Sequence, residues 1–486
     1  MTGTVFKLWH FGLRKIIQTI ASVNKHGFTL LALLDSVRNT NSGEACLQDE
    51  HEQLTYSGLY AQSVSTAAFI HNKYSIASKS KVAIISANSL PFIKSLFAAS
   101  GLGADIFLLN PNQNKEYYSH FFGTQKIDLI ISKSSIAEHF TAYKIPFLSF
   151  NTIPKYYSEI AAPNITRRKK SAVIILSSGS KGKPKPEKRK LAALKYLNPL
   201  LDIIEKLELR KHRSVLISVP IFHGYGFAAL LLSVFMGKKI YLTNKFDAQK
   251  TAAIAAQNDI DCWIAVPLMI QKVLGLKETI NIKSIISGGD TLSAALIKNI
   301  QQTEGIKIFN LYGTSETGVC TIATDEDLRK HPNTIGKVIT GVKTRLADND
   351  GSINMSDKTG LLSIKCSWSS DDKNGYVATG DLVSKNSDGY YFYKGRNDDM
   401  IIIGGENVYP VELENSIYKH PAIAWVKASS TIDEYRSVKM HVDIVIHSNS
   451  SLETEEFLSW LSGRVPNYMI PKSVNFLDQV RVSKLM

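Results

Sequence analysis

Short apolar runs alternate with helix-like segments from about residue 80 to residue 330, and this alternation limits the fold more than any other feature. The segments that follow the runs, such as Pro91–Ala99 and Leu292–Gln302, carry helical patterns or are punctuated by Gly and Pro. This alternation predicts an α/β fold with mostly parallel sheets, in which sites lie at the carboxyl ends of the strands. The strand candidates are Val82–Ser86, Asp105–Leu109, Asp128–Ser132, Ser171–Leu176, Val215–Val219, Lys239–Leu242, Trp263–Val266 and Ser284–Ser287.

The character of the sequence changes near Val338, where strands become shorter and turns become rich in Asn, Asp and Gly. We predict a large N-terminal domain of mostly parallel α/β sheets over residues 1–394. A small, mobile α+β C-terminal domain is predicted over residues 395–486, with the boundary at Lys394–Asp399. The segments that alternate in this tail are Met400–Ile403, Pro410–Tyr418, Met440–Ile446 and Thr454–Leu461.

The chain carries a formal net charge of +14, which suits a nucleic acid, an anionic membrane or a polyanionic small molecule. No RNP-like aromatic motif or zinc finger accompanies the charge, so we do not expect nucleic acid to be a partner. The four cysteines are far apart and form no CxxC pair, which indicates a reducing compartment and argues against a zinc site. No apolar run reaches transmembrane length and no signal peptide opens the chain, so we expect a cytoplasmic protein.

Residues 5–22 form a basic, amphipathic stretch with aromatic anchors such as Trp9 and Phe11. As a helix, this stretch could lie on an anionic membrane surface and make the protein peripherally membrane-bound. The alternative, which we favour, is a helix packed against the protein's own body.

The apolar run Ser171–Leu176 leads into a loop rich in hydroxyls, glycine and lysine. Glycine lets backbone N–H groups turn inward, hydroxyls donate hydrogen bonds and ammonium groups supply positive charge, as a polyphosphate requires. The loop is not a Walker motif, because two residues rather than four separate its glycines and Pro184 follows Lys183. A solvated basic turn is the alternative. The candidate residues are Ser177, Ser178, Gly179, Ser180, Lys181, Gly182 and Lys185.

Six further motifs follow the loop in a fixed order. The loop and these motifs together resemble those of the adenylate-forming superfamily, which includes acyl-CoA synthetases, luciferases and peptide-synthetase adenylation domains. With Phe97–Pro111 the resemblance covers nearly the whole chain, and two stretches (Phe97–Pro111 and Asn310–Arg329) look like bacterial fatty-acyl-CoA synthetases in particular. The motifs are Pro220–Gly226, Ser287–Leu292, Asn310–Glu316, Tyr376–Leu382, Gly395–Met400 with Gly404–Glu414, and Pro466–Pro471.

The resemblance implies that a carboxylate attacks the α-phosphorus of ATP and that pyrophosphate leaves. Such a step requires neutralised phosphates and aligned reactants. The loop would hold the β- and γ-phosphates, Thr314 would donate to the α-phosphate, and Glu316 would carry Mg²⁺, which prefers carboxylate and phosphate oxygens.

The same resemblance implies which residues contact the adenine and ribose of ATP. Tyr312 would offer an aromatic face beside adenine, with the strand end at Gly288–Asp290 against the ring. Asp381 would accept both ribose hydroxyls, and Arg396 would reach the same sugar. The residues assigned to ATP or AMP in this part of the chain are Gly288, Gly289, Asp290, Asn310, Tyr312, Gly313, Asp381 and Arg396.

For the second half-reaction the resemblance implies a moving C-terminal domain and coenzyme A as the thiol. Asp398 matches the hinge position of the family, where a backbone rotation is absorbed. Gly404, Gly405 and Glu406 would form the loop past which the pantetheine arm reaches the acyl-AMP. A carrier-protein phosphopantetheine is the alternative acceptor.

The segment Ile221–Tyr225 carries no acidic residue, so α-amino acids are disfavoured, because a buried ammonium without a counter-charge is costly. The surrounding residues are aromatic or small, as an acyl chain prefers. On this basis, and on the fatty-acyl resemblance, the sequence favours a medium- or long-chain fatty acid. His223 would lie near its carboxylate, or would be a structural histidine.

The pattern breaks at the C-terminus, because no Gly-Lys element follows Pro471. Lys484 would replace the family's adenylation lysine only if the final loop is shortened; otherwise this lysine is absent or lies beyond the given sequence. Lys181 and Pro186 also depart from the family's loop. A non-catalytic acyl- or nucleotide-binding relative is therefore an alternative to an acid–thiol ligase.

Overall fold

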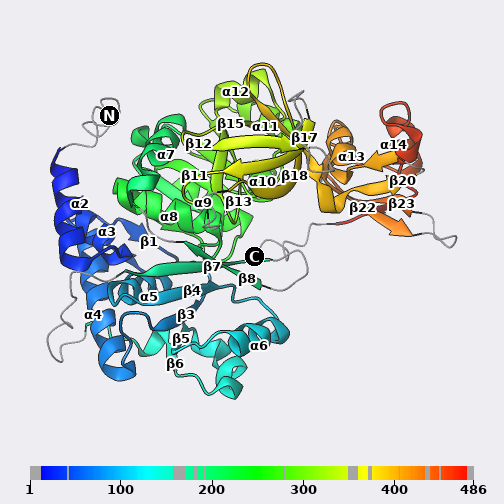
Figure 1. The fold of residues 1–486 in the computed structure, drawn as a ribbon. Helices are drawn as coiled ribbons and strands as arrows, with labels where there is room; N and C mark the ends of the chain where they lie inside the picture. The colour runs from blue at the N-terminus through cyan, green and yellow to red at the C-terminus, as the bar shows by residue number, and fades with distance from the viewer. Residues whose placement is uncertain are drawn as a thin grey trace.

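The structure is a computed structural model that describes residues 13–40, 43–156, 170–178, 184–189, 193–276, 278, 280–347, 359–369, 375–403, 406–432, 438–447 and 450–478. Figure 1 shows a body with a lower and an upper part, and a smaller unit beside the upper part. The lower part contains β3 to β8, the upper part contains most of the longer sheet, and the smaller unit contains β20 to β24.

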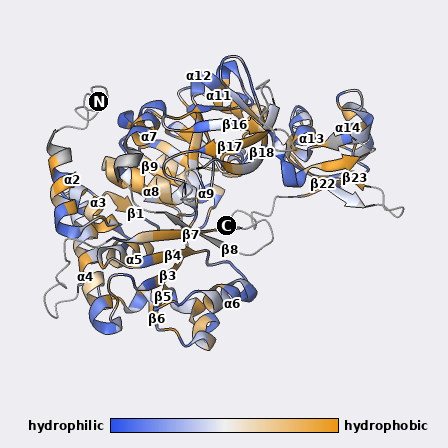
Figure 2. Cartoon of the chain, viewed as in Figure 1, coloured by the Kyte–Doolittle hydropathy of each residue, from blue (hydrophilic) through white to orange (hydrophobic). Residues whose placement is uncertain are grey.

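The lower part is a six-stranded sheet of order β6-β5-β3-β4-β7-β8. All neighbouring strands are parallel except β7 and β8, which form an antiparallel hairpin. The inner strands are nearly continuous apolar runs because helices cover the sheet, and Figure 2 shows this hydrophobic centre. The strands are β3 (Lys81–Ile85), β4 (Asp105–Leu109), β5 (Leu129–Ser132), β6 (Phe147–Ser149), β7 (Ala172–Ser178) and β8 (Pro184–Arg189); the helices are α4 (Tyr56–Tyr74), α5 (Leu90–Gly101) and α6 (Lys115–Thr124).

The longer sheet has thirteen strands in the order β16-β17-β18-β19-β15-β14-β13-β12-β11-β9-β10-β1-β2. The half from β1 to β13 is parallel, as the sequence predicted for this region. Its strands are β1 (Leu47–Gln48), β9 (Ser214–Ile217), β10 (Lys239–Leu242), β11 (Ile260–Ala265), β12 (Ile282–Gly288) and β13 (Lys307–Thr314), and β2 (Gln53–Leu54) pairs antiparallel at the edge.

The other half of this sheet is antiparallel from β13 onward. This half coincides with the change in sequence character, because short turns can join only antiparallel neighbours. The predicted α/β fold is confirmed, with this antiparallel extension added. Its strands are β14 (Gly318–Ala323), β15 (Thr334–Val338), β16 (Lys343–Ala347), β17 (Thr359–Lys365), β18 (Val377–Lys385) and β19 (Tyr391–Arg396).

Helices flank the parallel half and bury their apolar faces against it. Helix α8 is among the most apolar, and its start is fixed by the turn that precedes it. Together with the inner strands, the helices form one large hydrophobic core. They are α3 (Leu30–Val37), α7 (Ala193–Lys206), α8 (Gly224–Met236), α9 (Ala248–Gln257), α10 (Pro267–Leu274), α11 (Ala294–Gln302) and α12 (Asp325–Lys330).

The smaller unit has a hydrophobic core of its own, centred on Leu413, Val442 and Phe457. An antiparallel pair and a three-stranded sheet pack with two helices, which matches the alternation in the sequence tail. The division at residues 394 and 395 stays a prediction. The elements are β20 (Ile401–Ile403), β21 (Glu406–Val408), α13 (Pro410–Ile417), β22 (Ile423–Ile432), β23 (Val438–Ile446), α14 (Thr454–Leu461) and β24 (Ser473–Phe476).

The N-terminal helix α2 (Leu13–His26) packs through its second half on the body. Ser22 and His26 are buried, and the Ser22 hydroxyl donates to the Asp35 carboxylate at 3.0 Å. Ile17 and Ile20 are more than half exposed. The first part of the amphipathic stretch, residues 5–12, lies outside the described residues, so membrane contact stays a prediction. In the described part of the chain no helix is long and apolar enough to cross a membrane.

Candidate functional site

The candidate site begins where β12 and β13 end side by side. Their parallel register pairs Ser287 with Asn310 and Gly288 with Leu311. Two motifs that are far apart in sequence are thereby brought together. An added Cβ at Gly288 would lie 3.3 Å from the Leu311 carbonyl oxygen, so the glycine permits a close approach of backbone here. The next residue, Gly289, has φ of +82°, a conformation that favours glycine.

Asn310 is buried, and its side-chain amide donates to the Thr334 carbonyl at 3.3 Å. This contact ties β13 to β15 and gives Asn310 a structural role. Asp290 is exposed, and its carboxylate accepts from the Thr291 amide. The nucleotide-binding roles of Asn310 and Asp290 stay predictions.

Tyr312 and Asp381 are in direct contact although 69 residues separate them. The Tyr312 hydroxyl donates to Asp381 Oδ2 at 2.5 Å, and Arg396 lies 3.9 Å from Asp381 Oδ1. Burial raises the pKa of Asp381, while the Tyr312 hydrogen bond and the Arg396 charge oppose this rise. Asp399 and Glu316 also raise it through their negative charge, which places four of the predicted site side chains (Tyr312, Asp381, Arg396 and Glu316) in one electrostatic neighbourhood.

A tight turn between β13 and β14 carries Thr314, Ser315 and Glu316. Gly313 is required at its base, because an added Cβ would lie 2.0 Å from the Gly318 carbonyl oxygen. Glu316 is partly exposed on this turn. Its single carboxylate suits Mg²⁺, which is commonly bound through one or two carboxylates together with substrate phosphates.

The phosphate contact of Thr314 stays a prediction. The Thr314 hydroxyl is 2.9 Å from the Thr317 hydroxyl and accepts from the Thr317 amide at 3.2 Å, so it is engaged within the turn. Ser315 is the exposed hydroxyl beside it. The sequence itself points to Ser315, because this residue occupies the Ser/Thr position of the Tyr-Gly-x-(Ser/Thr)-Glu motif.

His223 precedes α8 at the end of a turn that follows β9. His223 is exposed, and its ring lies 4.6 Å from the Phe222 ring. The surrounding protein removes water from the charged form and lowers the pKa of His223. Two positions further on, the Tyr225 hydroxyl donates to the Ile286 carbonyl at 2.8 Å. This bond holds the aromatic ring beside Gly288, so the turn is directly connected to the end of β12.

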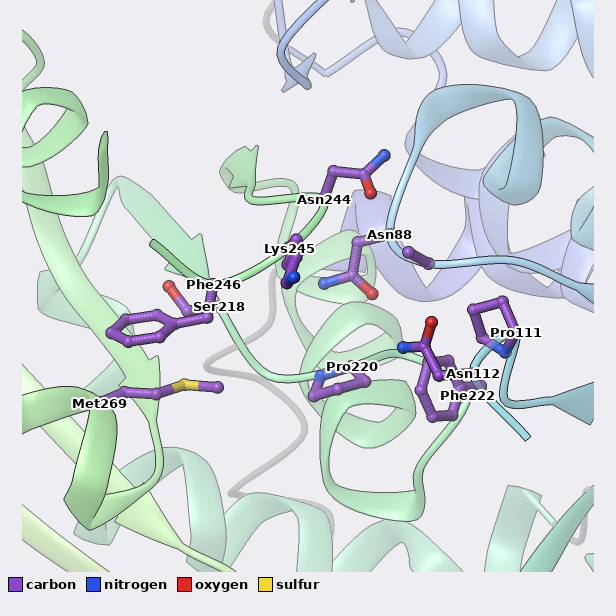
Figure 3. Close-up of a pocket in the computed structure, with 11 residues that line it drawn as sticks. Asn88, Pro111, Asn112, Ser218, Pro220, Phe222, Asn244, Lys245, Phe246 and Met269 are labelled. Carbon is purple, nitrogen blue, oxygen red and sulfur yellow. The ribbon is translucent and has the colours of Figure 1, made fainter. Parts of the chain in front are cut away.

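A cavity of about 110 Å³ lies between the ends of β3 and β4 and the ends of β9 and β10. Figure 3 shows Phe222, Pro220 and Met269 among its lining residues, together with Asn88 and Lys245. Phe222 connects this cavity to the turn that carries His223. The cavity is therefore apolar along much of its wall and has several polar groups around it.

The phosphate-loop candidate is the turn of the β7–β8 hairpin. Ser177 pairs with Lys185 and Ser178 with Pro184 where the two antiparallel strands meet this segment. Gly179, Ser180, Lys181 and Gly182 lie outside the described residues, and their phosphate contacts stay predictions. The same holds for Lys484.

The predicted hinge lies directly after the last strand of the longer sheet. Asp398 is in a single helical turn, Asn397–Asp399, and its carboxylate is 3.9 Å from the Arg396 guanidinium. Glu406 begins β21 and is exposed, whereas Gly404 and Gly405 lie outside the described residues. Arg396 thus lies between the predicted hinge and Asp381.

A sequence profile described as AMP-binding enzyme matches residues 34–368. The match spans more than half of the chain and includes the turn with Glu316. The chain belongs to the AMP-binding enzyme family. The adenylate-forming resemblance inferred from the motifs is thereby confirmed.

Two curated relatives of this AMP-binding enzyme are CoA ligases. The indoleacetate–CoA ligase of Aromatoleum aromaticum (strain DSM 19018 / LMG 30748 / EbN1) is 24% identical, over 92% of this chain and 94% of the relative. A 2-succinylbenzoate–CoA ligase of Bacillus cereus (strain ATCC 10987 / NRS 248) is 25% identical, over 89% and 92%. Both are named for acids that contain an aromatic ring. They give no support to the fatty acid that the sequence favoured, nor to the predicted role in fatty-acid metabolism.

Two solved structures have the same fold. The O-succinylbenzoate coenzyme A synthetase of Bacillus subtilis, in complex with ATP and a magnesium ion, has a TM-score of 0.78 at 21% identity, covering 92% of this chain and 96% of that one. The anthranilate CoA ligase AuaEII, in complex with anthranoyl-AMP, has a TM-score of 0.81 at 18% identity, covering 93% and 94%.

Proposed function

We propose that this AMP-binding enzyme is an acid–thiol ligase that joins an aromatic carboxylic acid to coenzyme A through an acyl-AMP intermediate. The observation that carries the proposal is the contact of Tyr312 with Asp381, with Arg396 and Glu316 around them. This group combines an aromatic face on β13, a ribose acceptor on β18 and a metal-binding carboxylate in the turn after β13.

In the first step a carboxylate oxygen of the acid attacks the α-phosphorus and the bond to pyrophosphate breaks. The Asp381 carboxylate accepts hydrogen bonds from the ribose hydroxyls, and the Tyr312 hydroxyl keeps this carboxylate in place. Glu316 would hold Mg²⁺, which neutralises charge on the phosphates. Thr314, on the same turn, would donate to the α-phosphate.

In the second step the thiol of coenzyme A attacks the acyl carbon, and AMP leaves. The bond between the acyl carbon and the AMP oxygen breaks as the thioester forms. Glu406 and its neighbours would line the path of the pantetheine arm. This order requires the smaller unit to move relative to the body, and Asp398 would absorb the rotation.

The relatives, rather than the cavity volume, favour an aromatic acid over a long acyl chain. The cavity beside Phe222 has about 110 Å³, which is less than the roughly 150 Å³ of a cavity that holds a benzene ring. An acid of either kind would therefore extend beyond this cavity. The relatives reported above are named for aryl acids.

A panel of acids tests the proposed function. The protein is incubated with ATP, Mg²⁺ and each acid, and pyrophosphate release is measured with and without coenzyme A. We expect aryl acids to exceed octanoate and palmitate in kcat/KM by about 10-fold or more, since a poor fit in an apolar pocket costs about 1–3 kcal/mol. A preference for palmitate contradicts the aromatic assignment. Bound ATP without pyrophosphate release contradicts the ligase and supports the nucleotide-binding alternative.

Replacement of Asp398 by proline tests the proposed movement. Proline fixes φ, so Asp398→Pro should hinder the rotation between the two steps. We expect acyl-AMP formation, measured as hydroxamate, to stay within about 3-fold, while thioester formation falls by about 10-fold or more. The control is Ser387→Pro, at the second position of the exposed turn closed by the Gly389 amide and the Asn386 carbonyl, which proline tolerates; it should leave the rates of both steps unchanged. Equal loss of both steps in Asp398→Pro would refute the hinge.

A further inference from the structure

Asn88 follows β3 at the carboxyl edge of the six-stranded sheet and is only 2% exposed. Its side-chain Nδ2 donates to the Val219 carbonyl at 2.9 Å. Its Oδ1 accepts from the Ile221 amide at 2.8 Å. Both partners follow β9, which belongs to the longer sheet. One buried amide therefore connects the two sheets at their carboxyl ends.

The segment around Asn88 is held firmly on its own side. Ser89 caps α5 by accepting from the Phe92 amide, and the Leu90 amide donates to Asp49 Oδ2 at 2.7 Å. Asp49 is itself fixed, since its Oδ1 accepts from the His51 and Glu52 amides at 2.8 and 2.9 Å. Asn88 thus projects from a rigid base.

The partners of Asn88 flank Pro220, which has no N–H of its own. The Pro220 carbonyl accepts from the His223 amide at 3.1 Å and closes a turn. On the far side of this turn, an added Cβ at Gly226 would lie 2.3 Å from the Pro220 carbonyl oxygen, so α8 packs directly against it. Asn88 and α8 therefore hold the turn from opposite sides.

This turn carries the two residues that face the acid in the proposed function. Phe222 lines the same cavity as Asn88 (Figure 3), and the exposed His223 directly follows Phe222 in the chain. We infer that Asn88 is a positioning residue for acid binding, which fixes Phe222 and His223 by bonding the backbone on both sides of Pro220. This inference rests on the proposed function and adds the element that sets the geometry of its acid site.

Two variants separate positioning from general stability. Asn88→Ala removes both hydrogen bonds, whereas Asn88→Asp keeps an acceptor for the Ile221 amide and loses the donor to Val219. The matched control is Ser100→Ala. Ser100 is fully buried in the last turn of α5 and accepts from the Leu30 amide at 2.8 Å, far along the helix from the turn.

The KM values for acid and for ATP are measured by pyrophosphate exchange in each variant. We expect Asn88→Ala to raise the KM for the acid by about 10-fold, as expected when buried backbone groups lose their partner, and the KM for ATP to stay within about 2-fold. Asn88→Asp should not recover the loss, because a buried carboxylate would face the Val219 carbonyl oxygen without a donor between them. Ser100→Ala should lower the melting temperature without changing either KM. An unchanged acid KM in Asn88→Ala, or an equal rise in both KM values, overturns the inference.

Hydrogen exchange of the Ile221 and His223 amides provides a readout that does not depend on activity. In folded Asn88→Ala both amides should exchange faster than in the wild type, while Ser100→Ala leaves them unchanged. Unchanged exchange in Asn88→Ala overturns the inference even if the wild type is active. A wild type that releases no pyrophosphate with any acid overturns the proposed function, and the exchange data then still decide whether Asn88 holds the turn.

Discussion

Replacement of Asp381 by asparagine should lower kcat/KM for ATP by about 100-fold, the upper range for losing hydrogen bonds to a charged group. The carboxylate is buried and is held between the Tyr312 hydroxyl and the Arg396 guanidinium. An amide of the same shape removes the charge and turns one acceptor into a donor, so one ribose hydroxyl loses its acceptor. Initial rates of pyrophosphate release at varied ATP measure this effect.

The control for Asp381→Asn is Tyr312→Phe, which keeps the aromatic face and removes only the hydroxyl that orients the carboxylate. We expect this variant to lose about 10-fold or less, because Asp381 keeps its charge. A second control is the acid KM, which should stay near the wild-type value in both variants. An Asp381→Asn enzyme with a normal KM for ATP would exclude Asp381 from nucleotide binding.

Replacement of Glu316 by glutamine should reduce the rate of pyrophosphate release by about 100- to 1000-fold, the size of an electrostatic contribution to a charged transition state. Glutamine has the shape of glutamate, so the turn closed by Gly313 and Gly318 should be preserved. The neutral side chain binds Mg²⁺ less well, and the Mg²⁺ concentration for half-maximal rate should rise. Rates measured over a range of Mg²⁺ at saturating ATP check both effects.

The matched control for this variant is Glu326→Gln. Glu326 is exposed in α12, where it pairs with Lys330 at 2.7 Å. This surface pair contributes little to stability, so rate and Mg²⁺ dependence should match the wild type. If Glu316→Gln retained a rate within about 3-fold of the wild type, Glu316 would not be the metal-binding carboxylate.

The local pattern of apolar and polar residues was sufficient to predict most of the individual helices and strands. The predicted strands Asp105–Leu109 and Lys239–Leu242 and the helix Thr454–Leu461 have the same limits in the structure. These segments are buried apolar strands or helices with one apolar face, so the spacing of their apolar residues indicates which faces are buried. The antiparallel half of the longer sheet was harder to predict from the sequence, because short half-exposed strands do not indicate which neighbouring strand they pair with.

The roles of individual hydroxyls and amides were harder to predict. Thr314 was assigned to phosphate, yet its hydroxyl is engaged by Thr317 within the same turn, and Ser315 is the exposed hydroxyl. Asn88 carried no signal in the sequence, because its partners lie 131 and 133 residues away. Orientation and long-range partners depend on packing and not on residue type.

The sequence by itself determined the α/β class, the family and the order of the motifs, because apolar periodicity and motif spacing are local properties of the chain. Only the tertiary structure decided that Tyr312 meets Asp381, that Thr314 is occupied within its turn and that Asn88 connects the two sheets. The contacts of Tyr312 and of Asn88 join segments far apart in the chain, whose positions are fixed by strand register and sheet order. The free energy that selects such register comes from burial of the whole core, so no short stretch of sequence encodes it.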